Sequence, residues 1–269
     1  MIKKPKEIHS FVDENNPTMR LDLFTWPEVD EYLRHCKGII LPIGSTEQHG
    51  PTGAIGTDAL TAQAVAHEVS KRTGVLVTPT QPYGMAEHHL GFAGTMSLRP
   101  ETLLELVHDL LISLSMHGFE KIFIVNGHGG NIATIKAAFS KAYRTISTME
   151  FSESKSFQCK LANWFMTPEV FKEAHSLYGD KEGQHATPSE IALTLYLEPS
   201  LLSKQCELPP PSPVGPIYDY KDFRQRYFDG RMGSDPFLAN ATDGEKFLDK
   251  AFFFSRKSCV FFKFSKYSS

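Results

Sequence analysis

The chain has 269 residues, of which 28 are basic and 31 acidic, giving a formal net charge of −3 at pH 7. This balance provides no basic surface for nucleic acid and no acidic tail, so a small-molecule partner is the default expectation. The length suits one large α/β domain with a core along most of the chain. We expect a polar, aperiodic N-terminal arm over residues 1–20, followed by a single domain over residues 21–269.

Neither a signal peptide nor a membrane span is expected from this sequence. The opening residues lack an apolar segment, and no run of about 18 apolar residues occurs. The four cysteines lie far apart and form no C-x-x-C pair, which indicates reduced thiols instead of disulfides or a zinc ribbon. We therefore expect a cytoplasmic protein with no membrane or nucleic-acid partner.

The first part of the chain alternates short apolar runs with helical patterns. A helix is predicted from Trp26, and a buried strand follows over 38–43. The next helix is predicted over 58–73, where Gly74 ends it, before a second strand over 75–78. This order is typical of an α/β fold.

The same rhythm continues in the middle of the chain. Pro100 opens a helix whose leucines recur at three-and-four spacing, and a third strand is predicted over 121–125. A glycine-rich turn then leads into a helix that carries Ile132 and Ile135. The repeated strand, turn and helix predict a parallel sheet covered by helices.

The last part of the chain is less regular. Three elements are expected there: a fourth strand over 157–164, a short lid helix over 168–177 and a helix from Pro188. Residues 209–236 are rich in proline and glycine and are expected to form a surface or subunit-contact excursion. Thr242 and Glu245 have capping-box spacing, which predicts that they open the last helix.

A candidate metal site follows the strand over 38–43. Glu47 and His49 are two residues apart, so in an extended segment their side chains leave the same face, and Asp58 begins the next helical pattern. Two carboxylates and an imidazole without a nearby cysteine suit Zn²⁺, Mn²⁺ or Fe²⁺. Ligands of open α/β sheets bind at this end of the strands. The alternative is that Asp58 only caps its helix and the other two are solvated loop residues.

The glycine-rich turn over 126–131 supplies a further histidine. Its glycines allow a close approach of the backbone, and we expect His128 to project into the same crevice as Glu47. Phosphate binding is an alternative that the turn fits poorly. The pattern is not G-x-G-x-x-G, because Ile132 occupies the third glycine position, and no G-K-[ST] follows.

Four motifs together resemble the creatininase (creatinine amidohydrolase) family over about residues 20–255. They are the Glu47-x-His49 pair, Asp58, the Asn126-Gly127-His128 turn and the His185-Ala186-x-x-x-Glu190 segment. The resemblance implies a three-layer α/β/α sandwich around a mostly parallel sheet. It also implies two divalent metal ions per subunit, Zn or Mn with Fe as an alternative, and a homohexamer.

The resemblance also implies which residues hold the two metal ions. One ion would be bound by the residues matching Glu47, Asp58 and His128, and the other by those matching His49 and Asp58 together with a further glutamate. Creatininases carry that glutamate two residues after the loop histidine, where this chain has Gly130. The second ion is therefore bound through Glu190, held by fewer protein ligands, or absent.

The chemistry implied by these ions is hydrolysis by a metal-bound hydroxide at neutral pH. His185 and Glu190 are the candidate catalytic residues. His185 suits a general acid for the departing nitrogen, and its alternative is a loop histidine hydrogen-bonded to backbone. The candidate substrate-binding residues are Gly94, Thr95, Gly129, Asn131, Trp164 and Tyr178.

The substrate is expected to be a small, cyclic amide or a related C–N compound. Creatininases place tryptophans on the flap over creatinine, whereas residues 165–190 contain none. Creatinine is therefore only one candidate. The alternatives are a deformylase-type amide hydrolase of the same family, a non-catalytic member with a degenerate site, and an enzyme that binds phosphorylated ligands.

Overall fold

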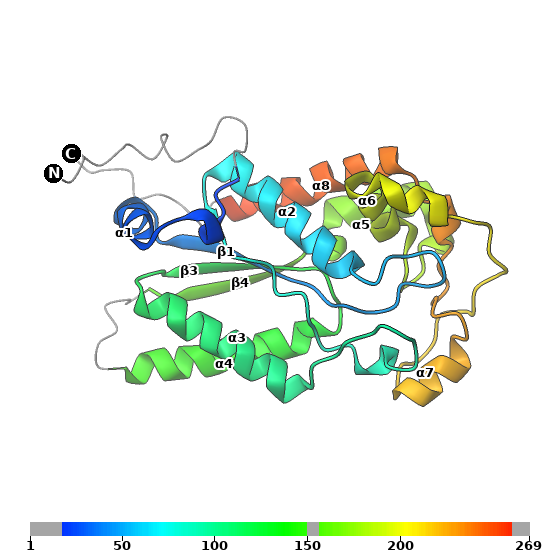
Figure 1. Ribbon diagram of the computed structural model, residues 1–269, viewed down its shortest axis with the longest axis horizontal. Helices are drawn as coiled ribbons and strands as arrows, with labels where there is room; N and C mark the ends of the chain where they lie inside the picture. Colours follow the sequence, from blue (N-terminus) through cyan, green and yellow to red (C-terminus); the bar gives the residue numbers. More distant parts are fainter. Residues whose placement is uncertain (1–17, 150–155, 260–269) are drawn as a thin grey trace.

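The structure is a computed structural model that describes residues 18–149 and 156–259 (Figure 1). Residues 1–17 of the expected arm lie outside the described part. The three described residues before the first helical turn run along the sheet edge, where Val77 N donates to Met19 O and Met19 N donates to Ser70 Oγ. Met19 is buried there.

Four parallel strands form the sheet, in the order β2-β1-β3-β4. They span Leu76–Val77 (β2), Gly38–Ile43 (β1), Lys121–Asn126 (β3) and Gln158–Asn163 (β4). The register aligns Ile43 with Asn126 and Asn126 with Asn163. Three strands therefore end level with one another, and the loops that follow them leave the same edge.

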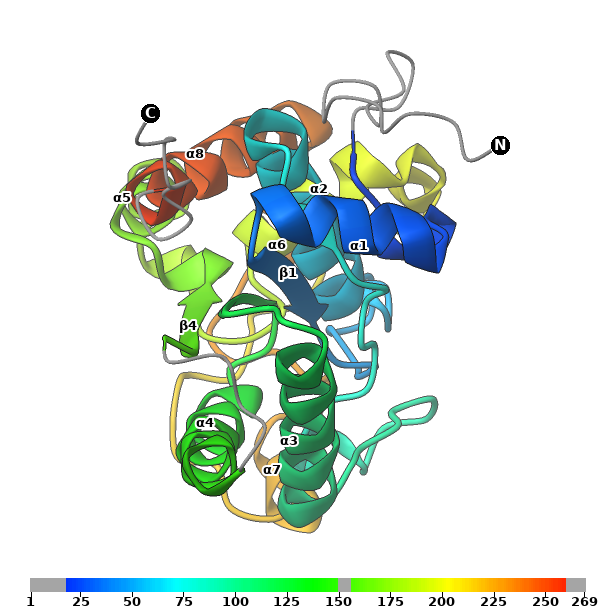
Figure 2. The same cartoon turned by 90° about the vertical axis from the view of Figure 1, so that its left-hand side faces the viewer.

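Eight helices are described, and most of them cover the two faces of this sheet. Their bounds are Trp26–His35 (α1), Thr57–Thr73 (α2), Pro100–Met116 (α3), Asn131–Thr148 (α4), Pro168–Tyr178 (α5), Pro188–Leu197 (α6), Tyr220–Arg226 (α7) and Ala241–Cys259 (α8). Helices α2, α5, α6 and α8 share one apolar core with one face of the sheet, and α1, α3 and α4 share another with the opposite face. Figure 2 shows α3 and α4 side by side beneath the sheet. The three-layer α/β/α expectation is confirmed.

The pleat of the central strands explains the two cores. In β1, Ile40 faces the core with α2, whereas Ile39 and Leu41 face the core with α3. Both central strands are buried at almost every position, as expected for parallel strands covered on both faces. Within the described residues, no helix combines the length and apolar character needed to cross a membrane.

Local sequence signals, such as proline at helix starts and glycine after a helix end, predicted most helix ends correctly. Proline occupies the first turn of α1, α3, α5 and α6, and Gly74 ends α2 in the left-handed conformation with φ of 70°. The capping box predicted from Thr242 is wrong. Helix α8 begins at Ala241, before Thr242. Its start is capped by Asn240, whose Oδ1 accepts from Asp243 N.

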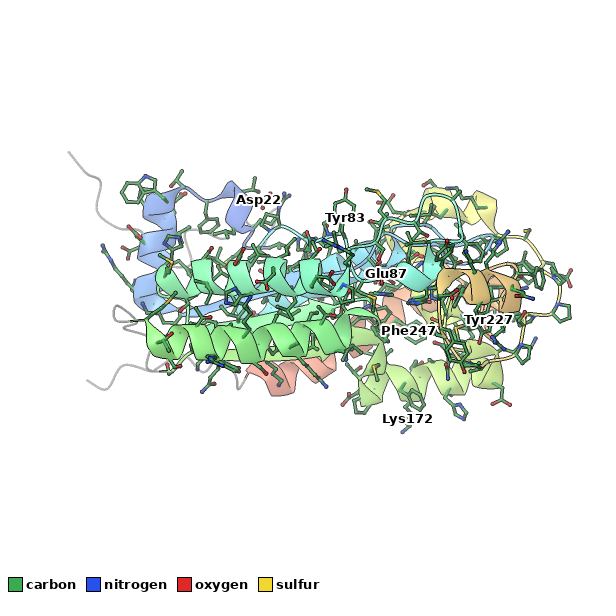
Figure 3. All side chains as sticks on the ribbon, turned by 90° about the horizontal axis from the view of Figure 1, so that it is seen from below. Asp22, Tyr83, Glu87, Lys172, Tyr227 and Phe247 are labelled. Atoms are coloured by element: carbon green, nitrogen blue, oxygen red, sulfur yellow. The ribbon has the colours of Figure 1, made fainter. Side chains whose placement is uncertain are left out.

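The fold corrects one further expectation and adds one helix. Helix α5 is not a lid, because Val170, Ala174 and Tyr178 bury it in the core that α8 shares. The excursion over 209–236 contains a short helix, α7, that was not expected from the sequence. Figure 3 shows that Tyr227, just after α7, lies at the same end of the molecule as Glu87.

Candidate metal centre

The predicted ligands come from four segments that meet at the carboxyl edge of the sheet. Glu47 and His49 lie in the loop after β1, Asp58 in the first turn of α2, and His128 in the turn after β3. Glu190 lies in the first turn of α6. The level ends of β1 and β3 bring these segments together, which is the position where open α/β sheets bind ligands.

Asp58 lies between two groups of candidate ligands. Its Oδ2 lies 3.2 Å from His128 Nδ1, which is also 3.1 Å from Glu47 Oε1. Its Oδ1 lies 3.1 Å from His49 Nε2, which in turn is 3.9 Å from Glu190 Oε2. Each group could hold a metal ion, and Asp58 belongs to both. The carboxylate does not cap α2, whose N-cap is Gly56 without a side-chain hydrogen bond.

Backbone carbonyls orient the two imidazoles of these groups. His49 Nδ1 lies 3.1 Å from Glu47 O, and His128 Nε2 lies 2.9 Å from Met85 O. A carbonyl only accepts, so the ring nitrogen that faces it carries the proton. The other nitrogen of each neutral ring therefore presents its lone pair to the carboxylates, as in metal-ligating histidines.

Several buried carboxylate oxygens in this centre make no hydrogen bond of normal geometry with the described residues. They are both oxygens of Glu47 and Oδ2 of Asp58. Burial raises the pKa of Glu47. Burial also disfavours the charged form of His49, but the carboxylate of Asp58 outweighs this and raises its pKa to about 10. Positive charge is thus favoured beside these oxygens, which a bound cation would supply.

Glu190 occupies the place that the resemblance left open. Its Oε1 accepts from Thr187 N at 2.6 Å in a capping box, while its Oε2 faces His49. Burial raises the pKa of Glu190 to about 7. A glutamate at position 130 would not fit, because a Cβ on Gly130 would lie 2.4 Å from both His128 Nε2 and Met85 O. The chain therefore offers Glu190 to the second group, and Gly130 protects the hydrogen bond that orients His128.

His185 lies beside the two groups but belongs to neither. Its Nε2 lies 2.8 Å from Gln48 O, and its Nδ1 lies 3.9 Å from Glu47 Oε1. Its backbone hydrogen bond was the alternative reading from sequence, and it coexists with a ring that faces the centre. Burial lowers the pKa of His185 well below 6.5, and the charge of His49 lowers it further. His185 is thus a neutral imidazole near the candidate ligands.

Four residues near the centre were missed by sequence reasoning. His89 Nε2 lies 3.3 Å from Glu47 Oε1, and the His88 ring is tilted by 46° against that of His89, with 4.1 Å between their centroids. Gln48 contacts both His89 and His185. The ring of Phe223 in α7 makes a T-shaped contact with the ring of His89, with 4.7 Å between their centroids. The excursion over 209–236 therefore forms one side of the centre. The adjacent histidines follow the carboxyl end of a strand, which is the one signal that could have identified them.

Three candidate substrate-binding residues prove to be interior residues. Asn131 is fully buried and hydrogen-bonds Met85 N, Gly44 O and Asn126 Oδ1, which joins three loops. Trp164 lies in the core and donates to Thr61 Oγ1, and Tyr178 donates to Asp243 Oδ2. These positions do not support ligand contact.

The other three candidates lie nearer to solvent. Gly129 and Gly94 are exposed, and Thr95 is half-buried. Thr95 Oγ1 accepts from Gln48 N at 3.2 Å, so it supports the loop that carries Glu47 and His49. Of the six, Gly129 directly follows the candidate ligand His128 in the chain, and Asn131 N donates to His128 O.

An α/β/α sandwich with clustered carboxylates and imidazoles at its carboxyl edge has the architecture of a metalloprotein. The creatininase family model, described as creatinine amidohydrolase, matches residues 22–253. The chain belongs to the creatininase family.

Individual relatives differ in what their names describe. The creatinine amidohydrolase of Pseudomonas putida is 29% identical over 206 residues, 72% of this chain and 78% of that protein. The 3-dehydro-scyllo-inosose hydrolase of Thermotoga maritima is 34% identical over 106 residues, 39% of this chain and 34% of that protein. The mycofactocin precursor peptide peptidase of Mycolicibacterium smegmatis is 39% identical over 106 residues, 37% of this chain and 42% of that protein. The match thus spans less than half of the latter two.

Solved creatininase structures share the fold over nearly their whole length. One described as "Creatininase Mn" has a TM-score of 0.78 and 26% identity, covering 91% of this chain and 99% of that one. A mutant creatininase of "Zn-Zn type" has a TM-score of 0.77 and 26% identity over the same shares. These relatives contain the metals that the donor set of this chain suits.

Proposed function

We propose that this protein is a metal-dependent amidohydrolase that cleaves a C–N bond of a small molecule and holds two divalent cations through the shared carboxylate of Asp58. The observation that carries the proposal is the set of buried oxygens on Glu47 and Asp58 that make no hydrogen bond within the described residues, although imidazole nitrogens lie 3.1–3.3 Å from them. Leaving buried carboxylate oxygens unpaired is costly. Cations between these oxygens and the lone pairs of His49 and His128 would satisfy them.

The residues present fit such cations in number and in kind. Glu47, Asp58 and His128 form one group, and His49, Asp58 and Glu190 form the other. Carboxylate and imidazole donors without thiolates suit Zn²⁺ or Mn²⁺, with Fe²⁺ as an alternative. When bound, such cations lower the pKa of water toward about 7 and polarise a carbonyl.

His185 is the residue that we propose moves the proton. With Nε2 donating to Gln48 O, its Nδ1 carries a lone pair on the side of Glu47. Its lowered pKa keeps it neutral at pH 7, so Nδ1 can accept the proton that the attacking water loses. The same nitrogen then returns that proton to the departing nitrogen of the amide. Glu190 acts as a ligand, since its Oε1 is already held by Thr187 N.

The walls of the centre favour a small and flat substrate. The His89 ring stacks on that of His185 and is tilted against that of His88, and Phe223 closes the side that α7 covers. A cyclic amide presents the planar carbonyl and ring faces that such walls accept. Among the relatives, a creatinine amidohydrolase supports a cyclic substrate, whereas a precursor peptide peptidase supports a linear amide. We propose the cyclic class and treat a linear or formyl amide as the competing outcome.

Metal removal followed by an amide panel tests the proposal. Protein stripped with a chelator should lose activity, and Zn²⁺ or Mn²⁺ should restore it. The panel would contain creatinine, hydantoin-type rings, lactams, aromatic formamides and short peptides. Full activity of thoroughly stripped protein would disprove metal dependence. Turnover of formamides or peptides alone would replace the cyclic class, and cation binding without any turnover would identify a non-catalytic member.

A further inference from the structure

Four histidines place a ring nitrogen within 4 Å of a carboxylate of the centre; backbone carbonyls orient three of them but not the fourth. His49 faces Glu47 O, His128 faces Met85 O, and His185 faces Gln48 O. Each of these rings therefore carries a proton on the outer nitrogen, whether or not the inner nitrogen is also protonated. The outer nitrogen of His89 instead faces the side-chain amide nitrogen of Gln48, at 2.8 Å.

The orientation of the Gln48 amide follows from its backbone partners. Its Oε1 accepts from Gly50 N at 2.8 Å, and its Nε2 donates to Gly230 O at 3.0 Å. A flipped amide would place oxygen against oxygen and nitrogen against N–H. The Gln48 side chain is buried. A Cβ at position 230 would lie only 1.9 Å from its Oε1, so glycine at this position makes room for the amide.

The amide has only two protons to give. One goes to Gly230 O, and the other goes to His89 Nδ1, which must then accept with its lone pair. His185 Nε2 also lies 2.9 Å from the amide nitrogen, but it is 2.8 Å from Gln48 O, to which it donates its own proton. The rings of His89 and His185 stack with 4.2 Å between their centroids. Gln48 thus orients both rings, His89 through its side-chain amide and His185 through its main-chain carbonyl.

We propose that Gln48 is a positioning residue: its side-chain amide keeps the proton of His89 on Nε2, toward Glu47, while its main-chain carbonyl keeps the lone pair of His185 on Nδ1. This deepens the proposed function, because it assigns opposite tasks to two neighbouring imidazoles. His185 can accept a proton, and His89 presents an N–H to the carboxylate of Glu47.

The proposal also predicts that a third group of candidate ligands does not bind a cation. Glu47, His89 and His185 lie close enough to hold a cation, and the 3.3 Å between His89 Nε2 and Glu47 Oε1 suits either a cation or a proton. With Gln48 donating to His89 Nδ1, the proton occupies Nε2. Only two of the three groups then bind cations.

Nitrogen NMR of the protein labelled with ¹⁵N-histidine tests this directly, because a protonated imidazole nitrogen resonates far from one that carries a lone pair. His89 and His185 are assigned through single substitutions. Both should show a proton on Nε2 in the metal-free protein. Addition of Zn²⁺ should shift the signals of His49 and His128 and leave the Nε2 proton of His89 in place. A proton on His89 Nδ1, or its replacement at Nε2 by zinc, would overturn the proposal in the unmutated protein.

Two variants separate positioning from support of the fold. Gln48→Met removes the donor at similar length, and Gln48→Glu retains an acceptor but has no N–H to give. In Gln48→Glu the proton of His89 should appear on Nδ1, while His185 keeps its proton on Nε2. We expect kcat to fall by about 10–100-fold in both variants, with a smaller change in KM. Gln63→Met, in which an exposed amide that accepts from Thr80 is lost, is the matched control.

The outcomes distinguish this proposal from the proposed function. A Gln48→Glu protein with the His89 proton still on Nε2, or a Gln48→Met protein with unchanged kcat, would refute the positioning role. An inactive wild type whose tautomers are as described would refute only the hydrolase activity.

Discussion

Replacement of Asp58 by asparagine tests the shared carboxylate most sharply. Asp58 places one oxygen 3.1 Å from His49 Nε2 and the other 3.2 Å from His128 Nδ1, so it is equally close to both groups. Asp58→Asn keeps the size of the side chain and removes one negative charge. We expect both cations to bind more weakly, whereas Glu190→Gln should weaken only the one near His49.

The size of the effect follows from the charges involved. At an effective dielectric constant of about 20, two unit charges 4 Å apart interact by about 4 kcal/mol, and a divalent ion doubles this value. Removal of the buried charge of Asp58 also relieves its own desolvation cost. A net loss of about 3–5 kcal/mol per cation, as for other broken buried pairs, corresponds to roughly 100- to 4000-fold weaker binding.

The assay is metal content after dialysis against a zinc buffer, together with kcat on the best substrate of the panel. Glu182→Gln is the matched control, because Glu182 is a part-buried carboxylate that accepts from Ser189 and belongs to none of the candidate ligand groups. It should keep both cations. His185→Ala should also keep both cations while kcat falls by about 10²–10⁴-fold.

Retention of the full metal content and rate by Asp58→Asn would refute the shared-carboxylate reasoning. Asp58 would then be only a structural partner of His49 and His128. Loss of metal from His185→Ala would show that His185 is a ligand, and the proton would have to be moved by another residue.

Four further predictions concern protons, substrate, assembly and the core. The raised pKa values of His49, about 10, and of His128 keep both charged in metal-free protein at pH 7, so Zn²⁺ binding should release about two protons. Metal affinity should therefore fall as pH decreases, and proton-neutral binding in a weakly buffered titration would contradict this. Creatinine should turn over more slowly than about 10 per second, the median for enzymes, because residues 165–190 contain no tryptophan to stack on its ring. Sedimentation at micromolar concentration should show a homo-oligomer, and a single 30.2 kDa species would exclude it. Trp164→Ala should lower the free energy of unfolding by about 3–5 kcal/mol with unchanged metal content, and metal loss in the folded protein would return Trp164 to the site.

Most of the fold could be predicted from short-range signals. Strand β1 is a continuous apolar run, and the proline starts and Gly74 mark helix ends that depend only on local backbone chemistry. Helix α7 was missed because its seven residues lie in a segment dominated by proline and glycine, and it is held by the packing of Phe223 against distant residues. Tertiary contacts decide such an element, and local sequence does not report them.

The site was predictable where its residues follow strands and unpredictable where they meet across the fold. The grouping of Glu47, His49, Asp58 and His128 follows from strand ends and spacing. Trp164 was misplaced because an aromatic residue near a predicted flap is indistinguishable in sequence from one that faces the core. The contacts of Gln48 with residues 41 and 137 positions away could not be read from sequence at all.

The carbonyl anchors of three histidines have a consequence for mutational tolerance. Every residue type offers a main-chain carbonyl, so no substitution at Met85 or at Glu47 can delete the acceptor that orients His128 or His49. Random variation at Met85 can therefore harm the site only by moving the backbone, whereas variation at Glu47 also removes a candidate ligand. His89 depends instead on one side chain, and a saturation library should be markedly less tolerant at Gln48 than at Met85.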